Sequence, residues 1–270
     1  MTFFAGLIVF ICGIAALLIL ILLHKRKKIS TTLAVWLAIV LIAVSSTYYV
    51  AVRVPHQQHE ARLNAAEHYF ISLPLYRTLK VQQPSLYQTL HQQYLSAVAT
   101  GDSETQALEH LRPMLADLLS QRISYASNEA LYRYMQVSLE QMKALRQQNS
   151  ELCFKFLFPQ VSGGINTTES LPVELRKKEG EALDYFLQQS FGAEHTGNAL
   201  QGREDLGNIV RSLYGRWGSD LQLINAPAET GADKTKLCEM TIDLYQSVLA
   251  LPVNHSAEVL RIILDGNANW

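Results

Sequence analysis

Two long apolar runs near the beginning of the chain constrain its fold more than any other feature. Residues 3–23 and residues 30–52 contain no charged side chain. Each run is long enough to cross, as a helix, a hydrocarbon core of about 30 Å. Because uncharged runs of this length are rare in soluble cores, two buried helices of a soluble protein are the weaker interpretation. We therefore predict a two-helix transmembrane hairpin over residues 1–54 and a soluble domain over residues 55–270.

The charges around the two runs predict the orientation of the hairpin. The loop of residues 24–29 holds four consecutive basic residues, Lys25 to Lys28, whereas Arg53 is the only basic residue directly after the second run. Basic residues in short loops are retained in the cytoplasm. We therefore expect a two-pass protein of the bacterial inner membrane, whose amino terminus and soluble domain lie in the periplasm.

A cleaved signal peptide is the alternative interpretation of the first run. Such a peptide has its basic residues before the apolar core and a small-residue cleavage site after it. In this chain the basic cluster follows the run. This order is typical of a retained span whose amino terminus lies outside.

The charge balance excludes some classes of partner. Four of the 23 Lys and Arg residues lie in the loop, and all 24 Asp and Glu residues follow the second run, which leaves 19 basic against 24 acidic side chains outside the loop. This balance argues against a nucleic-acid partner, which requires a basic surface. It also argues against electrostatic docking on anionic lipid, so the expected contact with the bilayer is the integral one.

Two of the three cysteines could pair in an oxidising compartment. Cys12 lies inside the first apolar run and is interpreted as a small apolar residue. Cys153 and Cys238 lie in the soluble domain, where they could form a disulfide worth roughly 4 kcal/mol. Two separate buried thiols are the alternative. No C-x-x-C spacing occurs, so neither a redox motif nor a zinc site is supported.

Apolar residues recur at helical spacing through most of the soluble domain, which predicts an all-α fold with few strands. The polar stretch after the second run either continues the membrane helix or begins a new one after Pro55. Pro113 predicts a kink or two short helices, and Ser127 or Asn128 begins a helix that ends near Gln148. The longest loop is expected over residues 160–171, and further helices over residues 172–191, 203–224, 233–251 and 256–264.

Three histidines just past the second run are the candidates for metal binding. His56 and His59 are three residues apart and would share a helical face, with His68 further along. Neutral imidazoles together with a carboxylate bind zinc. The H-E-x-x-H spacing is absent, however. The favoured interpretation is a hydrated helix face at the membrane–water interface. We predict no metal site and no cofactor.

The sequence contains none of the familiar catalytic motifs. It lacks a G-x-S-x-G elbow and the glycine-rich phosphate loops. Glu179, Glu181 and Asp184 fall on one predicted helix, but three basic residues are interleaved with them. Such a pattern is typical of a solvated, salt-bridged face. A glycan hydrolase would instead need carboxylates such as Glu67 or Glu181 in a deep pocket.

Aromatic residues are the candidates for a partner surface. Tyr185, Phe186, Tyr214 and Trp217 could line such a surface, although aromatic residues at helical spacing are more often part of a core. Trp270 could dock on this chain or on a partner, or fray.

These features favour a membrane-anchored, non-enzymatic binding or accessory protein of the bacterial cell envelope. It would be a subunit of an envelope complex, or an immunity-type protein that captures a toxic protein partner. One alternative is an envelope hydrolase with an unfamiliar helical active site. Another is a sensory domain, which would need a separate membrane partner because the loop of residues 24–29 is too short for an output domain.

Overall fold

The computed structural model describes residues 22, 25–26, 30–228, 231 and 233–264. Every regular element within these residues is helical and none is a strand, which confirms the predicted all-α fold. The chain divides into two compact units, residues 1–65 and residues 66–270. Apart from Leu22, the first predicted span lies outside the described residues, as do Cys12 and Trp270.

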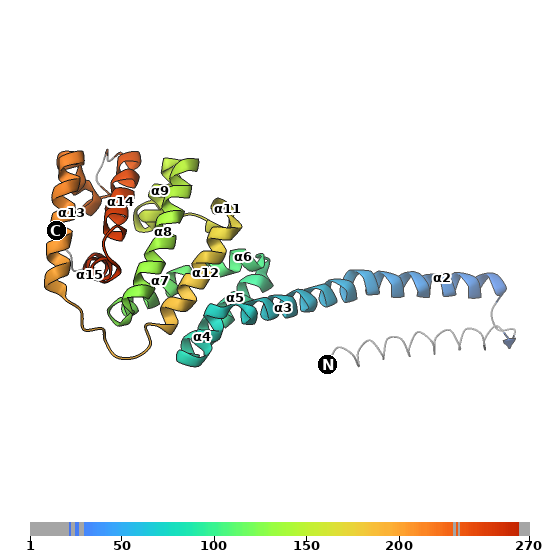
Figure 1. The fold of residues 1–270 in the computed structure, drawn as a ribbon. Coiled ribbons are helices and arrows are strands. Elements are labelled where there is room, and N and C mark those ends of the chain that lie inside the picture. Colours follow the sequence, from blue (N-terminus) through green and yellow to red (C-terminus); the bar gives the residue numbers. More distant parts are fainter. Residues whose placement is uncertain (1–21, 23–24, 27–29, 229–230, 232, 265–270) are drawn as a thin grey trace. The chain divides into compact units, whose positions relative to one another are not determined.

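The first unit is dominated by an apolar helix. It begins with α2 (Thr31–Tyr48), continues through the π-helical turn η1 (Tyr49–Arg53) and runs into α3 (Val54–Ser72) (Figure 1). The Ser30 hydroxyl accepts a hydrogen bond from the Leu33 N–H and caps the start. Within the described residues, one helix, Val35–Ser72, is long and apolar enough to cross a membrane, and no part of its apolar window is buried. The predicted pairing of two spans stays a prediction.

Pro55 does not interrupt this helix, because a π turn precedes it. A proline ring clashes with the carbonyl four residues earlier, which here belongs to Ala51. Ala51 lies within η1, where the Val54 N–H bonds to the Tyr49 carbonyl. The wider π turn makes room for the ring and lets the helix continue. Of the two alternatives after Pro55, the structure therefore has the continuous helix.

The second unit contains the end of α3 and a succession of shorter helices. They are α4 (Pro74–Gln82), α5 (Pro84–Thr100), α6 (Glu104–Glu109), α7 (Arg112–Arg122), η2 (Ile123–Tyr125), α8 (Asn128–Gln148), α9 (Ser150–Leu157), α10 (Pro159–Ser162), α11 (Thr167–Ser170), α12 (Val173–Gln188), α13 (Ala199–Trp217), η3 (Gly218–Asn225), α14 (Lys234–Leu249) and α15 (Val253–Leu264).

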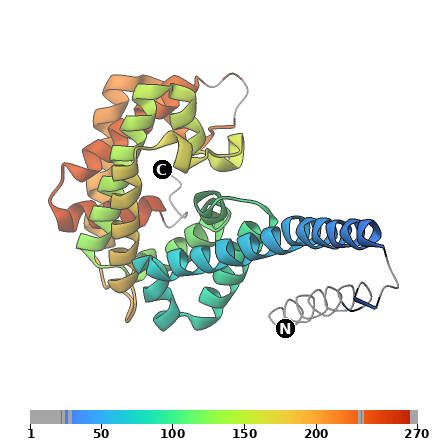
Figure 2. The ribbon, with the colours of Figure 1, turned by 90° about the vertical axis from the view of Figure 1, so that its right-hand side faces the viewer.

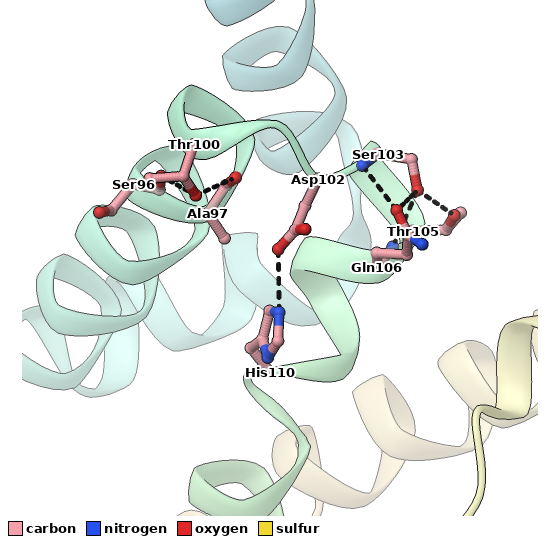
Figure 3. A network of polar contacts seen from close by, with 8 residues as sticks. All are labelled: Ser96, Ala97, Thr100, Asp102, Ser103, Thr105, Gln106 and His110. Carbon is pink, nitrogen blue, oxygen red and sulfur yellow. Dashed lines mark hydrogen bonds and ion pairs between the residues drawn. The ribbon is translucent and has the colours of Figure 1, made fainter.

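Local sequence signals explain most of the helix boundaries. The Ser127 hydroxyl caps α8, and the Asp233 carboxylate caps α14. Pro113 lies in the first turn of α7, so the run that contains it is divided into α6 and α7, as predicted. Figure 3 shows the start of α6, where the Ser103 and Gln106 side chains form a capping box.

Beside this capping box, one hydrogen bond ties the α5–α6 turn to the end of α6. The His110 ring nitrogen Nε2 lies 2.9 Å from the Asp102 carboxylate (Figure 3). Both side chains are exposed, so we interpret the pair as a local tether of the turn.

Three predicted boundaries are wrong. The expected loop over residues 160–171 contains α10 and α11, because Asn166 and Pro159 begin short helical turns there. The helix α13 begins at Ala199 rather than at residue 203, since the Asn198 side chain caps it. The last helix begins at Val253, directly after Pro252, and not at Ser256.

The helix α8 lies at the centre of the second unit. It packs against α9, α12, α14 and α15, and Figure 1 shows it between α12 and α14. The helix α12 also packs against α4, which lies beside it in teal in the turned view of Figure 2. Because α12 contacts both α4 and α8, it joins the amino-terminal helices of the unit to the carboxyl-terminal ones.

A disulfide joins α9 to α14. It links Cys153 to Cys238, whose Cα atoms lie 5.9 Å apart. Both cysteines are fully buried in a cluster with Leu145 and Leu171. Of the two alternatives for these cysteines, the structure has the bonded pair.

Candidate functional site

The second unit contains a cavity of about 530 Å³ between the end of α3, α4, α6, α7, α11 and α12. Its volume falls within the range of about 300–1,000 Å³ that is usual for ligand pockets. Most of the wall is apolar, and its aliphatic and proline members are Leu73, Pro74, Leu75, Leu108, Leu115, Val173 and Leu183.

A guanidinium between two carboxylates forms the polar part of the wall. Both terminal nitrogens of Arg112 donate to Glu179 Oε1, at 3.1 and 2.7 Å. The Nε of Arg112 lies 3.3 Å from Glu109 Oε2. The other oxygen of Glu109 accepts hydrogen bonds from Thr167 and, at 3.0 Å, from Thr168. This network connects α6, α7, α11 and α12 in one place.

Burial sets the proton affinity of the groups around this network. Desolvation raises the pKa of Glu179, and the Arg112 guanidinium opposes that shift without cancelling it. Burial also raises the pKa of Tyr76, which lines the same cavity. The Tyr76 phenol therefore stays protonated at neutral pH, while Glu179 holds its proton more strongly than an exposed glutamate does.

Arg176 differs from the other cations of the cavity. Arg112 is engaged by two carboxylates, and Lys177 lies 3.9 Å from Glu181. Arg176 lines the cavity from α12 but forms no ion pair with any described residue. Its Nε is buried and has no hydrogen-bond partner. Among the described residues of the cavity wall, Arg176 is therefore a cation without a direct ion-pair partner.

The histidines that were candidate metal ligands lie along one helix, α3. His56, His59 and His68 are all exposed. His56 Nδ1 lies 3.5 Å from Glu60 Oε1, which is an ordinary i, i+4 pair on a helix surface. Among the described residues, no group of three or more His, Cys, Asp or Glu side chains is placed to hold a metal ion.

The aromatic candidates for a partner surface are not gathered in one place. Phe186 is only 1% exposed and packs in the core, so its assignment to a surface is wrong. The Tyr185 ring lies 4.8 Å from the Arg133 guanidinium, and Trp217 Nε1 donates to Asp243 at 3.0 Å. Tyr214, on α13, is 53% exposed. Phe186 faces inward because the stripe of α12 that contains it packs against α8.

The carboxylates considered for catalysis separate into different environments. Glu179 and Glu181 line the cavity, Glu179 in a half-buried position and Glu181 in an exposed one. Asp184 accepts a hydrogen bond of 2.6 Å from the Thr78 hydroxyl. Glu67 lies 3.8 Å from His91 and is not among the cavity-lining residues.

Sequence reasoning missed three residues of the site, Glu109, Arg112 and Arg176. Arg112 and Glu179 are separated by 67 positions, so no local spacing connects them. The interleaved charges of residues 176–181 were a correct sign of ion pairing for Lys177 and Glu181. They gave no sign that Arg176 would be left without a partner.

No family model, no curated protein and no solved structure matches this chain. The class of protein is therefore defined by its own features: an exposed apolar helix, an all-α domain with a buried disulfide, and an apolar cavity crossed by an ion-pair network.

Proposed function

We propose that this chain is a membrane-anchored, non-enzymatic binding protein of the bacterial cell envelope. Its helical domain would capture a partner protein, as a subunit of an envelope complex or as an immunity-type protein. The observation that carries the proposal is the apolar cavity, in which Arg112 holds the carboxylates of Glu109 and Glu179 in place. Such a wall suits recognition, because its polar groups are already oriented before a ligand arrives.

The membrane anchor and the periplasmic location of the domain rest on three observations. The helix Val35–Ser72 exposes its apolar side chains, as a bilayer-spanning helix does. The basic residues Lys25 to Lys28 favour a cytoplasmic loop between two spans. The bond between Cys153 and Cys238 favours an oxidising compartment, because such bonds are rare in the cytoplasm. Together they support a two-pass protein with its domain in the periplasm.

Site-specific photo-crosslinking in living bacteria tests the proposal. A photoreactive phenylalanine analogue would replace Val173, which lines the cavity and is 63% exposed. Leu200 is the matched control, because it is 78% exposed and lies outside the cavity. We expect a discrete protein adduct from position 173 and none from position 200. Absence of an adduct at position 173, or the same adducts at both positions, would contradict the proposal.

One observation favours a second candidate, the envelope hydrolase. Burial raises the pKa of Glu179 within the cavity, and this is the direction of shift that a general acid requires. In this case Glu179→Gln would abolish the release of reducing sugars from purified envelope glycans, with folding intact by circular dichroism. Wild-type protein that releases no sugars would eliminate this candidate.

A further inference from the structure

The cavity contains a guanidinium that forms no ion pair with any described carboxylate. Glu109 and Glu179 are both engaged by Arg112, and Glu181 faces Lys177. Arg176 remains without a counter-charge among the described residues, with its Nε buried and unbonded. A buried donor without a partner is costly. A ligand that supplies an acceptor at Arg176 would remove this cost on binding.

The chemistry of a guanidinium indicates which acceptor fits. Arginine presents a planar fork of donors that matches a carboxylate with two parallel hydrogen bonds. Only one cation is free, whereas Glu109, Glu179 and Glu181 would repel a doubly charged anion. A cationic ligand would be repelled by Arg176, and a neutral acceptor could bond to its Nε but would supply no counter-charge. A single negative charge is thus the complement of this wall.

The remainder of the wall indicates what carries that charge. Leu108, Leu115, Val173 and Leu183 provide apolar surface from α6, α7 and α12 around the cavity. Apolar area removed from water contributes about 25 cal/mol per Å², so a ligand with apolar groups beside its carboxylate uses both parts of the cavity. A small inorganic anion would use only one.

We infer that the cavity binds an acidic side chain flanked by large apolar side chains, in a segment of the partner protein, with Arg176 as the anion partner. This inference rests on the proposed function, since it names the chemistry of the segment that the domain would capture. We assign no anion to Arg112, because its guanidinium charge already faces the carboxylates of Glu109 and Glu179.

The test compares two synthetic peptides on the full-length protein in lipid nanodiscs. One dye-labelled peptide has a glutamate between leucine and phenylalanine residues, and the other has glutamine in its place. Binding is followed by fluorescence anisotropy. A hydrogen-bonded charge pair predicts that the glutamate peptide binds about 10- to 100-fold more tightly than the glutamine peptide.

Three variants locate the interaction. Arg176→Gln should weaken binding of the glutamate peptide by about the same factor, so that the two peptides then bind with equal affinity. Lys178→Gln is the control, because it removes one positive charge from the same helix at an exposed pair with Glu140, outside the cavity. Gly180→Leu should abolish binding of both peptides by filling the cavity. A Cβ at Gly180 meets nothing within 4 Å, so this change does not strain the helix.

Each of four outcomes would overturn the inference. Equal affinity of the two peptides for the wild-type protein would remove the role of charge. Discrimination that survives Arg176→Gln, or binding that survives Gly180→Leu, would place the recognition elsewhere. Soluble 4-phenylbutanoate, with 4-phenylbutanol as its neutral control, is the third probe. If it binds through Arg176 and the peptides do not, the occupant is a small carboxylic acid and the peptide inference is wrong.

The crosslinking experiment separates this inference from the proposed function. Adducts at position 173 without peptide discrimination would leave the binding function in place and refute the carboxylate chemistry. Peptide discrimination without adducts at position 173 would show the chemistry and refute capture of a protein partner in the cell.

Discussion

Replacing both Cys153 and Cys238 with alanine would remove the covalent link between α9 and α14. The bond closes a loop of 85 residues. In the chain-entropy treatment, opening a loop of this length costs about 4.5 kcal/mol at 25 °C, because the unfolded chain becomes less constrained. Domains are stable by only about 5–15 kcal/mol, so this loss would be a large part of the total.

The buried position of the bond adds to this cost. Both cysteines are 0% exposed and pack against Leu145 and Leu171. Alanine leaves a small void where each sulfur was, and such voids destabilise by roughly 1 kcal/mol or less per missing atom group. Burial also predicts that a reductant reaches the bond only when the domain opens, so mild reduction should be slow without denaturant.

Urea unfolding of the full chain in nanodiscs, followed by circular dichroism, measures the effect. With a urea dependence of about 2–3 kcal/mol per molar, the midpoint should fall by roughly 1.5–2 M. Cys12→Ala would be included in every sample so that only this pair remains. Thiol labelling of the denatured, unreduced protein would verify the bond. A midpoint shift below about 0.5 M, or free thiols in protein purified from cells, would refute the reasoning and remove the main chemical support for a periplasmic domain.

Three further predictions concern the charge of the cavity, the helix glycines and the topology. The pKa of Glu179 is raised in the folded protein above its ordinary value of 4.5. Its contribution to the stability of the folded state is therefore fully present below pH 4.5 and is lost as the pH rises through the raised pKa. Glu179→Gln should therefore gain stability relative to wild type as the pH increases, and a pH-independent difference in urea midpoint would contradict this. Gly180→Ala should raise the free energy of unfolding by about 0.5–1 kcal/mol, and the melting temperature with it, since its Cβ meets nothing within 4 Å. Gly202→Ala should lower it, because that Cβ would lie 3.0 Å from the backbone carbonyl carbon of Glu258 as well as 2.9 Å from the Ile262 side chain. Alkaline phosphatase fused to the carboxyl terminus should be active, and activity of a cytoplasmic reporter instead would reverse the topology.

The helices were predictable where their signals are local. Ser127 and Asp233 cap α8 and α14 at the positions that the sequence indicates, and Pro113 separates α6 from α7. A capping side chain accepts a hydrogen bond from an N–H within three residues of it, so the local sequence is enough to predict the cap. The loop predicted over residues 160–171 was wrong because turns as short as α10 and α11 carry too few apolar positions to show a period.

The candidate site was less predictable, because its parts come from distant segments. Glu179 and Glu181 are two residues apart and look alike in the sequence, yet one is held by Arg112 and the other faces Lys177. Residues two apart on a helix point in different directions, and the packing of α12 against its neighbours decides which of them is buried. The same packing buries Phe186.

The sequence by itself determined the helical class of the fold, the apolar character of the helix that includes Val35, and the acidic balance that argues against nucleic acid. These properties depend on composition and on periods of a few residues. Only the tertiary structure decided that Cys153 meets Cys238, that Arg112 binds two carboxylates, and that Arg176 meets none. Each of these outcomes depends on which helix faces bury each other, and this choice is made by the free energy of the whole core rather than by any local stretch of chain.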